Sequence, residues 1–96
     1  MKINDVLESF NKALDVLGNP RRLHYVAHSS WERKIGSVKS ATTIITLIDP
    51  QDKPKEVLRE ECTDSVPAGQ EEVLIERSQK KALTEFIIRW SNDTGT

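Results

Sequence analysis

Apolar residues recur at helical spacing in the first segment of the chain. Between Asn4 and Leu17 they fall every three or four positions and form one stripe. The stripe consists of Ile3, Val6, Leu7, Phe10, Leu14 and Leu17. Asn4 or Asp5 can cap the start of a helix, and Gly18-Asn19-Pro20 is a strong stop signal. The pattern therefore predicts an amphipathic helix over residues 4–17.

From Leu23 the apolar period changes to two, which is the period of a β-strand. This pattern predicts a strand over residues 23–31. It turns Tyr25 and Trp31 toward the core and places His24 and His28 on the opposite face. Residues 32–40, which contain Gly36, are predicted to form a polar turn or a loose connection.

Residues 41–48 are β-branched and apolar on both faces, as is typical of a central strand. The prolines and aspartates of residues 49–54 predict a reverse turn after it. Residues 55–64 fit either a strand or a short helix that begins after Pro54. Because they follow a tight turn, we favour a hairpin partner at the edge of the sheet, where its charged side chains meet water.

The last large segment again has helical spacing. After a loop over residues 65–69, a helix is predicted that ends near Trp90 and carries Glu71 and Glu72 in its first turn, where the helix dipole favours acids. Its apolar stripe consists of Ile75, Ala82, Leu83, Phe86, Ile87 and Trp90. An alternative makes residues 72–77 a strand and lets Ser78 cap a shorter helix. We favour the long helix.

Together these elements predict a single α+β domain over residues 1–96 in the order αβββα, with residues 1–3 and 91–96 frayed. Its sheet is three-stranded and antiparallel, and the N-terminal helix and the longer C-terminal helix pack on one face. Two helices cannot cover both faces of so small a sheet. The other face is therefore predicted to be open to solvent or to a partner.

Composition adds that the core is lean. Hydrophobic residues make up 36% of the chain, against about 45% in an average globular protein, so help from a partner or a second copy is expected. No apolar run approaches the ~18 residues of a membrane span. The N-terminus turns acidic at Asp5 without the apolar stretch of a secretory signal, and Cys62 is the only cysteine. These features predict a cytoplasmic protein.

The pattern offers no residues for catalysis or for a metal or cofactor. His24 and His28 on one strand would stand about 13 Å apart, too far to share an ion. The acids around Cys62 disfavour the thiolate that a nucleophile needs. The adjacent carboxylates Glu60-Glu61 and Glu71-Glu72 are expected to be solvated, and the dispersed glycines form no phosphate-binding loop. The sequence therefore predicts no enzyme, no metal site and no cofactor.

What remains is a non-enzymatic accessory or adaptor-like domain that acts by protein–protein binding, self-association included. The prediction rests on the final helix, which carries Val73, Leu74 and Ile88 on roughly the opposite side from its main stripe. A helix that is apolar on two sides is usually sandwiched or docked to a partner. Fraying, or burial under the loop at residues 65–69, explains the same three residues equally well. Neither a membrane nor a small-molecule substrate is inferred.

Nucleic-acid binding is the alternative. Cations gather early in the chain beside Tyr25 and Trp31, where they could contact phosphates while the rings contact bases. The candidate residues are Arg21, Arg22, His24, His28, Arg33, Lys34 and Lys39. The predicted order of elements, with Ser78-Gln79-Lys80-Lys81-Ala82 in the last helix, resembles that of double-stranded-RNA-binding domains in topology alone. In a long helix Lys80 and Lys81 lie far from the N-terminus, where phosphate would bind.

Overall fold

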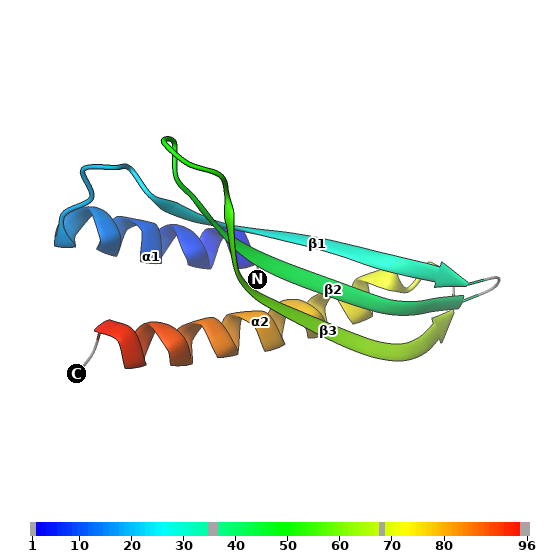
Figure 1. The fold of residues 1–96 in the computed structure, drawn as a ribbon. Coiled ribbons are helices and arrows are strands. Elements are labelled where there is room, and N and C mark those ends of the chain that lie inside the picture. Colours follow the sequence, from blue (N-terminus) through cyan, green and yellow to red (C-terminus); the bar gives the residue numbers. More distant parts are fainter. Residues whose placement is uncertain (1, 35–36, 68, 95–96) are drawn as a thin grey trace.

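The computed structural model describes residues 2–34, 37–67 and 69–94. Along the chain follow α1 (Ile3–Leu17), β1 (His24–Lys34), β2 (Ser37–Ile48), β3 (Lys55–Pro67) and α2 (Glu71–Thr94). The strands form one antiparallel sheet in the order β1-β2-β3. Both helices pack on the same face of it (Figure 1). The predicted α+β class, the αβββα order and the longer C-terminal helix are confirmed.

The strands are longer than the sequence pattern predicts, and the molecule is elongated, at 48 × 28 × 18 Å. The turn or loose connection expected over residues 32–40 is wrong for residues 32–34 and 37–40, because β1 runs to Lys34 and β2 begins at Ser37. Residues 35–36 lie outside the described residues. Antiparallel pairing continues to the last residue of β1 across a bulge in β2. Ladder hydrogen bonds satisfy the backbone there although the side chains are polar. The β1–β2 hairpin therefore projects beyond the part of the sheet that α1 covers (Figure 1).

Both helices reach further toward the chain ends than expected. α1 begins at Ile3, whose side chain is buried in the core, and α2 continues to Thr94. Residues 3 and 91–94, for which fraying was predicted, are therefore helical, whereas Lys2 precedes α1 and residues 1, 95 and 96 lie outside the described residues. The residue before α1, Lys2, makes no side-chain cap. Asn4, a predicted cap, lies inside the helix and bonds to β1 instead.

Two segments that the sequence leaves ambiguous have one structure each. Residues 55–64 belong to β3 and lie at an edge of the sheet, as we favoured, and residues 72–77 are helical. The start of α2 is held because Leu74 is buried against Ala41, with Val66 and Ile75 around them. Among the residues described here, no helix has the length and apolar character needed to cross a membrane.

The main core lies between the sheet and the two helices. Its buried side chains are Ile3, Leu7, Ile45, Leu58, Ala82, Leu83 and Phe86. Edge-to-face aromatic pairs extend it, with ring centroids 4.8 to 5.2 Å apart for Tyr25–Phe86, Phe10–Phe86 and Phe10–Trp90. Tyr25 therefore faces the core, as predicted. These rings tie α1 to α2 across β1.

Two side chains that were expected in the core, those of Trp31 and Ile87, lie at the surface. Trp31 is 46% exposed, because α1 begins beside Ala27 and does not extend over the later part of β1. Ile87 is 42% exposed. The true buried stripe of α2 runs through Leu74, Ser78 and Ala82, and its i, i+4, i+8 spacing was hidden from the sequence pattern by a polar residue in the middle.

Candidate functional site

Three asparagine side chains cover the first half of the outer edge of β1. Each amide donates to the carbonyl of one strand residue and accepts from the N–H of the same residue. The pairs are Asn19 with Leu23, Asn11 with Tyr25 and Asn4 with Ala27, at N···O distances of 2.7 to 3.2 Å. A side-chain amide carries the same donor and acceptor as a peptide unit. The three asparagines therefore take the place of a fourth strand along residues 23–27.

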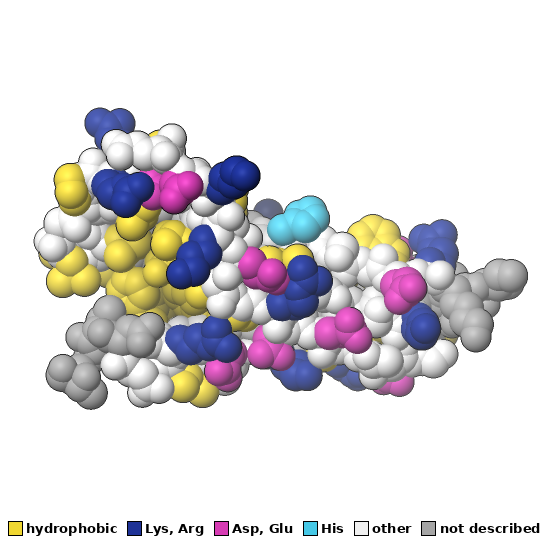
Figure 2. Space-filling view, viewed as in Figure 1, with side chains coloured by type: hydrophobic (Ala, Val, Ile, Leu, Met, Phe, Trp, Pro, Cys, Tyr) yellow, Lys and Arg dark blue, Asp and Glu magenta, His cyan; other side chains and the backbone are white. Residues whose placement is uncertain are grey.

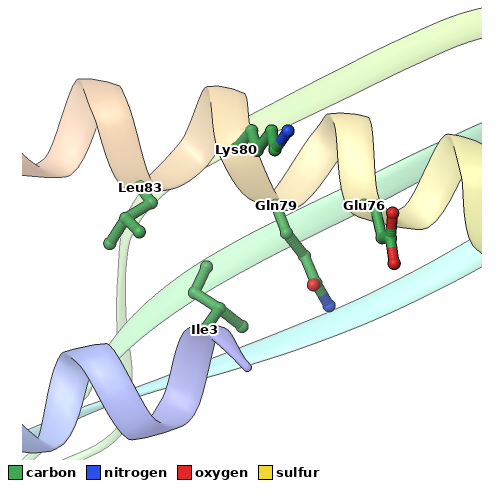
Figure 3. A pocket seen from close by; sticks show the side chains of 5 residues that line it. All are labelled: Ile3, Glu76, Gln79, Lys80 and Leu83. Carbon is green, nitrogen blue, oxygen red and sulfur yellow. The ribbon is translucent and has the colours of Figure 1, made fainter. Parts of the chain in front are cut away.

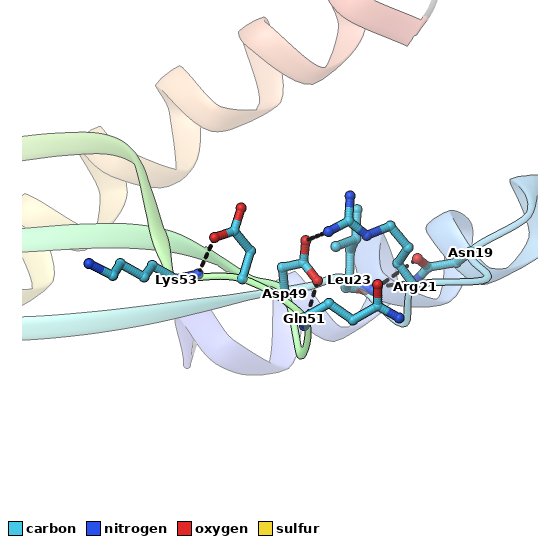
Figure 4. A network of polar contacts seen from close by, with 7 residues as sticks. Asn19, Arg21, Leu23, Asp49, Gln51 and Lys53 are labelled. Atoms are coloured by element: carbon cyan, nitrogen blue, oxygen red, sulfur yellow. Dashed lines mark hydrogen bonds and ion pairs between the residues drawn. The ribbon is translucent and has the colours of Figure 1, made fainter.

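The positions of these asparagines follow from helix and loop geometry. Asn4 and Asn11 are seven residues apart in α1, so they lie on one face two turns apart. Asn19 lies in the loop after α1, where it also donates to Asp15. An ion pair between Arg21 and Asp49 joins this loop to the turn between β2 and β3 (Figure 4). Sequence reasoning missed the covering role, although the seven-residue spacing beside an apolar stripe is a usable signal.

Cations from α2 cover the opposite edge of the sheet, which is formed by β3. Lys81 Nζ donates to the carbonyl of Glu61 at 3.1 Å, and the Arg89 guanidinium donates to the carbonyl of Val57 at 2.9 Å. Charged side chains along an edge strand discourage another strand from pairing there. Lys81 and Arg89 therefore occupy two backbone carbonyls of the β3 edge.

An exposed ion pair adds to this edge. Arg77 lies 3.0 Å from Asp64. The hydrogen bond from the N–H of Ser65, followed by the Arg77 guanidinium, lowers the pKa of the Asp64 carboxyl below its ordinary value of 3.8.

Beyond Ala27 the outer edge of β1 has no such cover. Because backbone groups alternate in direction along an antiparallel strand, the N–H and C=O groups of Ser29, Trp31 and Arg33 point away from β2. Among the described residues, no hydrogen bond reaches these groups from outside the sheet. We call residues 28–34 of β1 the open edge. The half-exposed ring of Trp31 lies at its centre.

A groove lies beside the open edge, between the N-terminus of α1 and the middle of α2. It holds about 320 Å³ and is lined by Ile3, Glu76, Gln79, Lys80 and Leu83 (Figure 3). An adjoining hollow adds Lys2, Asn4, Asp5, Glu72 and Ile75. The Gln79 amide donates to Ser29 Oγ at 3.1 Å, so this part of α2 lies against the beginning of the open edge.

Two acids of α2 line this groove and the adjoining hollow, beside Lys2 and Lys80. Within the described part of the chain, neither Glu72 nor Glu76 forms an ion pair. Glu76 and Lys80 are four residues apart in α2 and do not pair, whereas Glu85 and Arg89, at the same spacing, lie 3.5 Å apart. The carboxylates of Glu72 and Glu76 are therefore available to a cation that approaches along the open edge.

A chain of hydroxyl groups crosses the core under the same groove. The Ser78 hydroxyl donates to the carbonyl of Ile75 at 2.8 Å, so it must accept from Thr43 at 2.7 Å. Thr43 then accepts from Ser29 at 2.8 Å, and Ser29 accepts from Gln79. Thr43 and Ser78 are fully buried. The hydrogen bonds of the described residues connect no histidine or carboxylate to these hydroxyls, so the chain is a structural link between β1, β2 and α2.

The residues proposed for protein binding on α2 do not form one surface. Val73 and Ile88 are exposed, at 39% and 48%, but 15 residues of helix separate them by about 22 Å. Leu74 is fully buried beneath the first turns of α2, so its assignment to the surface is wrong. Its contact with Ala41 explains the error, because the sequence pattern does not show which turn of the helix passes over β2.

A second apolar surface lies at one end of the molecule. Figure 2 shows hydrophobic side chains gathered in a hollow between the β2–β3 turn and the C-terminal part of α2. The exposed apolar residues near the C-terminal ends of the two helices are Val16 and Leu17 in α1 and Ile87 and Ile88 in α2. The aromatic residues Phe10 and Trp90 are only partly buried beside them.

The candidate nucleic-acid residues are spread over the molecule. Arg21 and Arg22 lie in the loop before β1, whereas Arg33 lies near the far end of this strand, roughly 30 Å away. His24 and His28 are exposed on the face opposite the helices, Lys39 is exposed in β2, and the side chain of Lys34 lies outside the described residues. The structure therefore forms no single basic surface from the candidates it describes.

Metal-binding geometry is likewise not assembled. His24 and His28 lie on the extended β1, as predicted, and the described residues contain no group of three or more potential ligands. Cys62 is a free, partly buried cysteine in β3.

Comparisons of the chain with protein-family models, with curated proteins and with solved structures find no match. Functional inference therefore rests on the geometry of the site.

Proposed function

We propose that this chain is a non-enzymatic protein-binding domain that binds an extended segment along the open edge of β1. In this mode a segment adds a strand to the sheet, and backbone hydrogen bonds supply much of the affinity. The observation that carries the proposal is the contrast along the edges. Asparagines cover residues 23–27 and two cations of α2 occupy carbonyls of β3, while residues 28–34 keep donors and acceptors available.

The side chains around the open edge fit this role. Trp31 offers an aromatic surface, the residue type most enriched among energetically dominant interface residues. The groove beside it can receive alternate side chains of an added strand, since these point to the helix side of the sheet at every second residue. Glu76 in that groove and Glu72 in the adjoining hollow form no ion pair, so each can contact a positive charge of the segment, beside Lys80 and Lys2.

Nucleic-acid binding is less well supported. The first turn of α2 carries Glu71 and Glu72, which repel phosphate from the helix end that would otherwise attract it. Arg21 is already paired with Asp49.

A selection from a displayed library of random linear peptides tests the proposal. We expect selected peptides to shift the backbone amide resonances of Ser29, Trp31 and Arg33. Trp31→Pro should abolish binding, because the proline removes an outward N–H while leaving the ladder to β2 intact. Val26→Lys is the matched control, since Val26 is a partly exposed apolar residue on the opposite face of the same strand and should leave binding unchanged.

Two results would overturn the proposal. One is a set of selected peptides that perturb other surfaces and bind Trp31→Pro as well as the unmodified protein. The other is tight binding of an RNA duplex that weakens steeply with salt and is lost when Arg21, Arg22 and Arg33 are neutralised together. The second result would support the nucleic-acid alternative.

A further inference from the structure

We propose that the segment bound by the open edge is the open edge of a second copy of this chain. The two β1 strands then pair antiparallel about a two-fold axis at Trp31 and join two three-stranded sheets into one of six strands. This inference rests on the proposed function and names its partner.

The length and symmetry of the open edge carry the first step. The edge is closed at Ala27 by Asn4, and β1 ends at Lys34, so the free stretch is residues 28–34 with Trp31 in the middle. A register centred on Trp31 places Ser29 opposite Arg33 of the second copy and His28 opposite Lys34. Every free position then has a partner, and about six backbone hydrogen bonds form.

The neighbouring registers are each penalised. Moving the centre to Ser30 brings Arg33 of the second copy opposite Ala27, where the Asn4 amide already occupies the backbone groups. Moving it to Glu32 places two glutamates directly opposite each other, which is unfavourable for like charges. The register centred on Trp31 instead places Glu32 opposite Ser30.

The side chains at the centre complement each other on the helix side of the sheet. Two Trp31 residues lie opposite each other with Cα atoms about 5.5 Å apart, as in any hydrogen-bonded antiparallel pair. Each ring, 46% exposed in one copy, then covers the other. Aromatic cross-strand pairs stabilise sheets beyond their backbone bonds.

Charge complementarity points to the same partner. Arg33 of the second copy comes opposite Ser29, whose hydroxyl contacts Gln79, and Glu76 lies one helical turn from Gln79. Among the described residues neither Arg33 nor Glu76 forms an ion pair within one copy. The two-fold axis repeats the contact, so the dimer gains two such pairs.

The register has a direct signature in the unmodified protein. Ser30 and Glu32 of the second copy form a non-hydrogen-bonded pair, in which the strands approach most closely, with Cα atoms about 4.5 Å apart. In a mixture of isotope-labelled and unlabelled protein we expect an intermolecular nuclear Overhauser effect between the Hα atoms of these two residues. Sedimentation over about 10 µM to 1 mM should show a monomer–dimer equilibrium.

Charge reversal supplies the matched variants. Arg33→Glu and Glu76→Arg should each raise the dimer dissociation constant by about tenfold or more, and combining them should restore most of the loss. Trp31→Lys should yield a folded monomer by circular dichroism and sedimentation, while Val26→Lys should dimerise normally.

Several results would overturn the inference. They are a monomer throughout the concentration range, intermolecular contacts that map to another surface, or charge-reversal effects that add instead of cancelling. If the protein stays monomeric but library peptides still bind the open edge, the second copy is the wrong partner and the proposed function stands. If peptides also fail to bind there, the proposed function fails as well.

Discussion

Of the asparagines that cover the edge of β1, Asn11 is expected to contribute more to stability than Asn4. Its amide is partly buried and satisfies both the N–H and the C=O of Tyr25, at 2.7 and 3.1 Å. Asn4 makes the same pair of bonds with Ala27 in a more exposed position. Water can replace a lost partner at the exposed site more easily than at the partly buried one.

We therefore expect Asn11→Ala to lower the free energy of unfolding by about 2 kcal/mol and Asn4→Ala by roughly half as much. Urea denaturation followed by circular dichroism measures both. Asn92→Ala, at an exposed position of α2, is the control and should change little. Equal effects for all three variants would mean that the amides do not hold the strand.

The hydroxyl chain predicts energetic coupling between Thr43 and Ser78. Thr43→Val strands the Ser29 hydroxyl without an acceptor and leaves Ser78 without its donor, at a cost of about 1–3 kcal/mol. The variant Ser78→Ala already lacks the hydrogen bond between Thr43 and Ser78, so Thr43→Val has less to remove in that background. The double variant should therefore cost less than the sum of the single ones by about 0.5 kcal/mol or more in urea denaturation. If the losses in the free energy of unfolding of the two single variants add without coupling, the hydroxyl groups do not form the hydrogen-bonded chain described above.

Asp64 predicts a small pH dependence of stability. Its folded pKa is lowered by the Ser65 N–H and by Arg77, so its contribution is present above the ordinary value of 3.8 and is lost as pH falls through the folded pKa. The difference in thermal midpoint between the unmodified protein and Asp64→Asn should be largest above pH 4 and should shrink on acidification. A difference that grows as pH falls would show that the carboxylate is not stabilised in the folded state.

At the scale of elements, neighbouring residues at the start of α2 have opposite roles. Leu74 is fully buried against Ala41, whereas Val73 is 39% exposed. Leu74→Ala should lower the free energy of unfolding by about 2–5 kcal/mol through loss of burial and a cavity. Val73→Ala should cost less than about 0.5 kcal/mol. Comparable losses from the two variants in denaturant titrations would show that α2 is rotated from the position described.

The helices and strands follow from local periodicity, which is why their order could be predicted. Period-two alternation marks β1, and apolar runs at three and four mark α1. The errors lie where a distant element decides the outcome. Trp31 is exposed because α1 begins too late to cover it, and residues 32–34 pair with residues 37–40 because two polar stretches face each other across a hairpin. Neither fact is encoded in the residues themselves.

The candidate site was harder to predict than the fold because backbone groups carry much of it. The open edge exists because the asparagine cover stops at Ala27, and this depends on where α1 crosses β1. Side-chain type points instead to Val73, Leu74 and Ile88, of which one is buried and two lie at opposite ends of α2. The basic residues are conspicuous in the sequence but end up far apart.

At the scale of the whole molecule, the three edge regions differ in how they are closed. Amides close one half of β1, cations of α2 occupy two carbonyls of β3, and the remaining half of β1 is left with the Trp31 ring and its outward backbone groups exposed. A sheet edge without such cover is usually paired with a strand of another chain in the working protein, since it otherwise promotes aggregation. The lean core is consistent with a chain that gains stability from association.

Amide hydrogen exchange along β1 tests this account most directly, measured at low and at high protein concentration. In dilute protein we predict slow exchange at Tyr25 and Ala27, whose N–H groups bond to asparagines, and fast exchange at Trp31 and Arg33. At high concentration Trp31 and Arg33 should become protected while Tyr25 and Ala27 stay as they were. Fast exchange at Trp31 that is independent of concentration would contradict self-association, and slow exchange there in dilute protein would contradict the open edge itself.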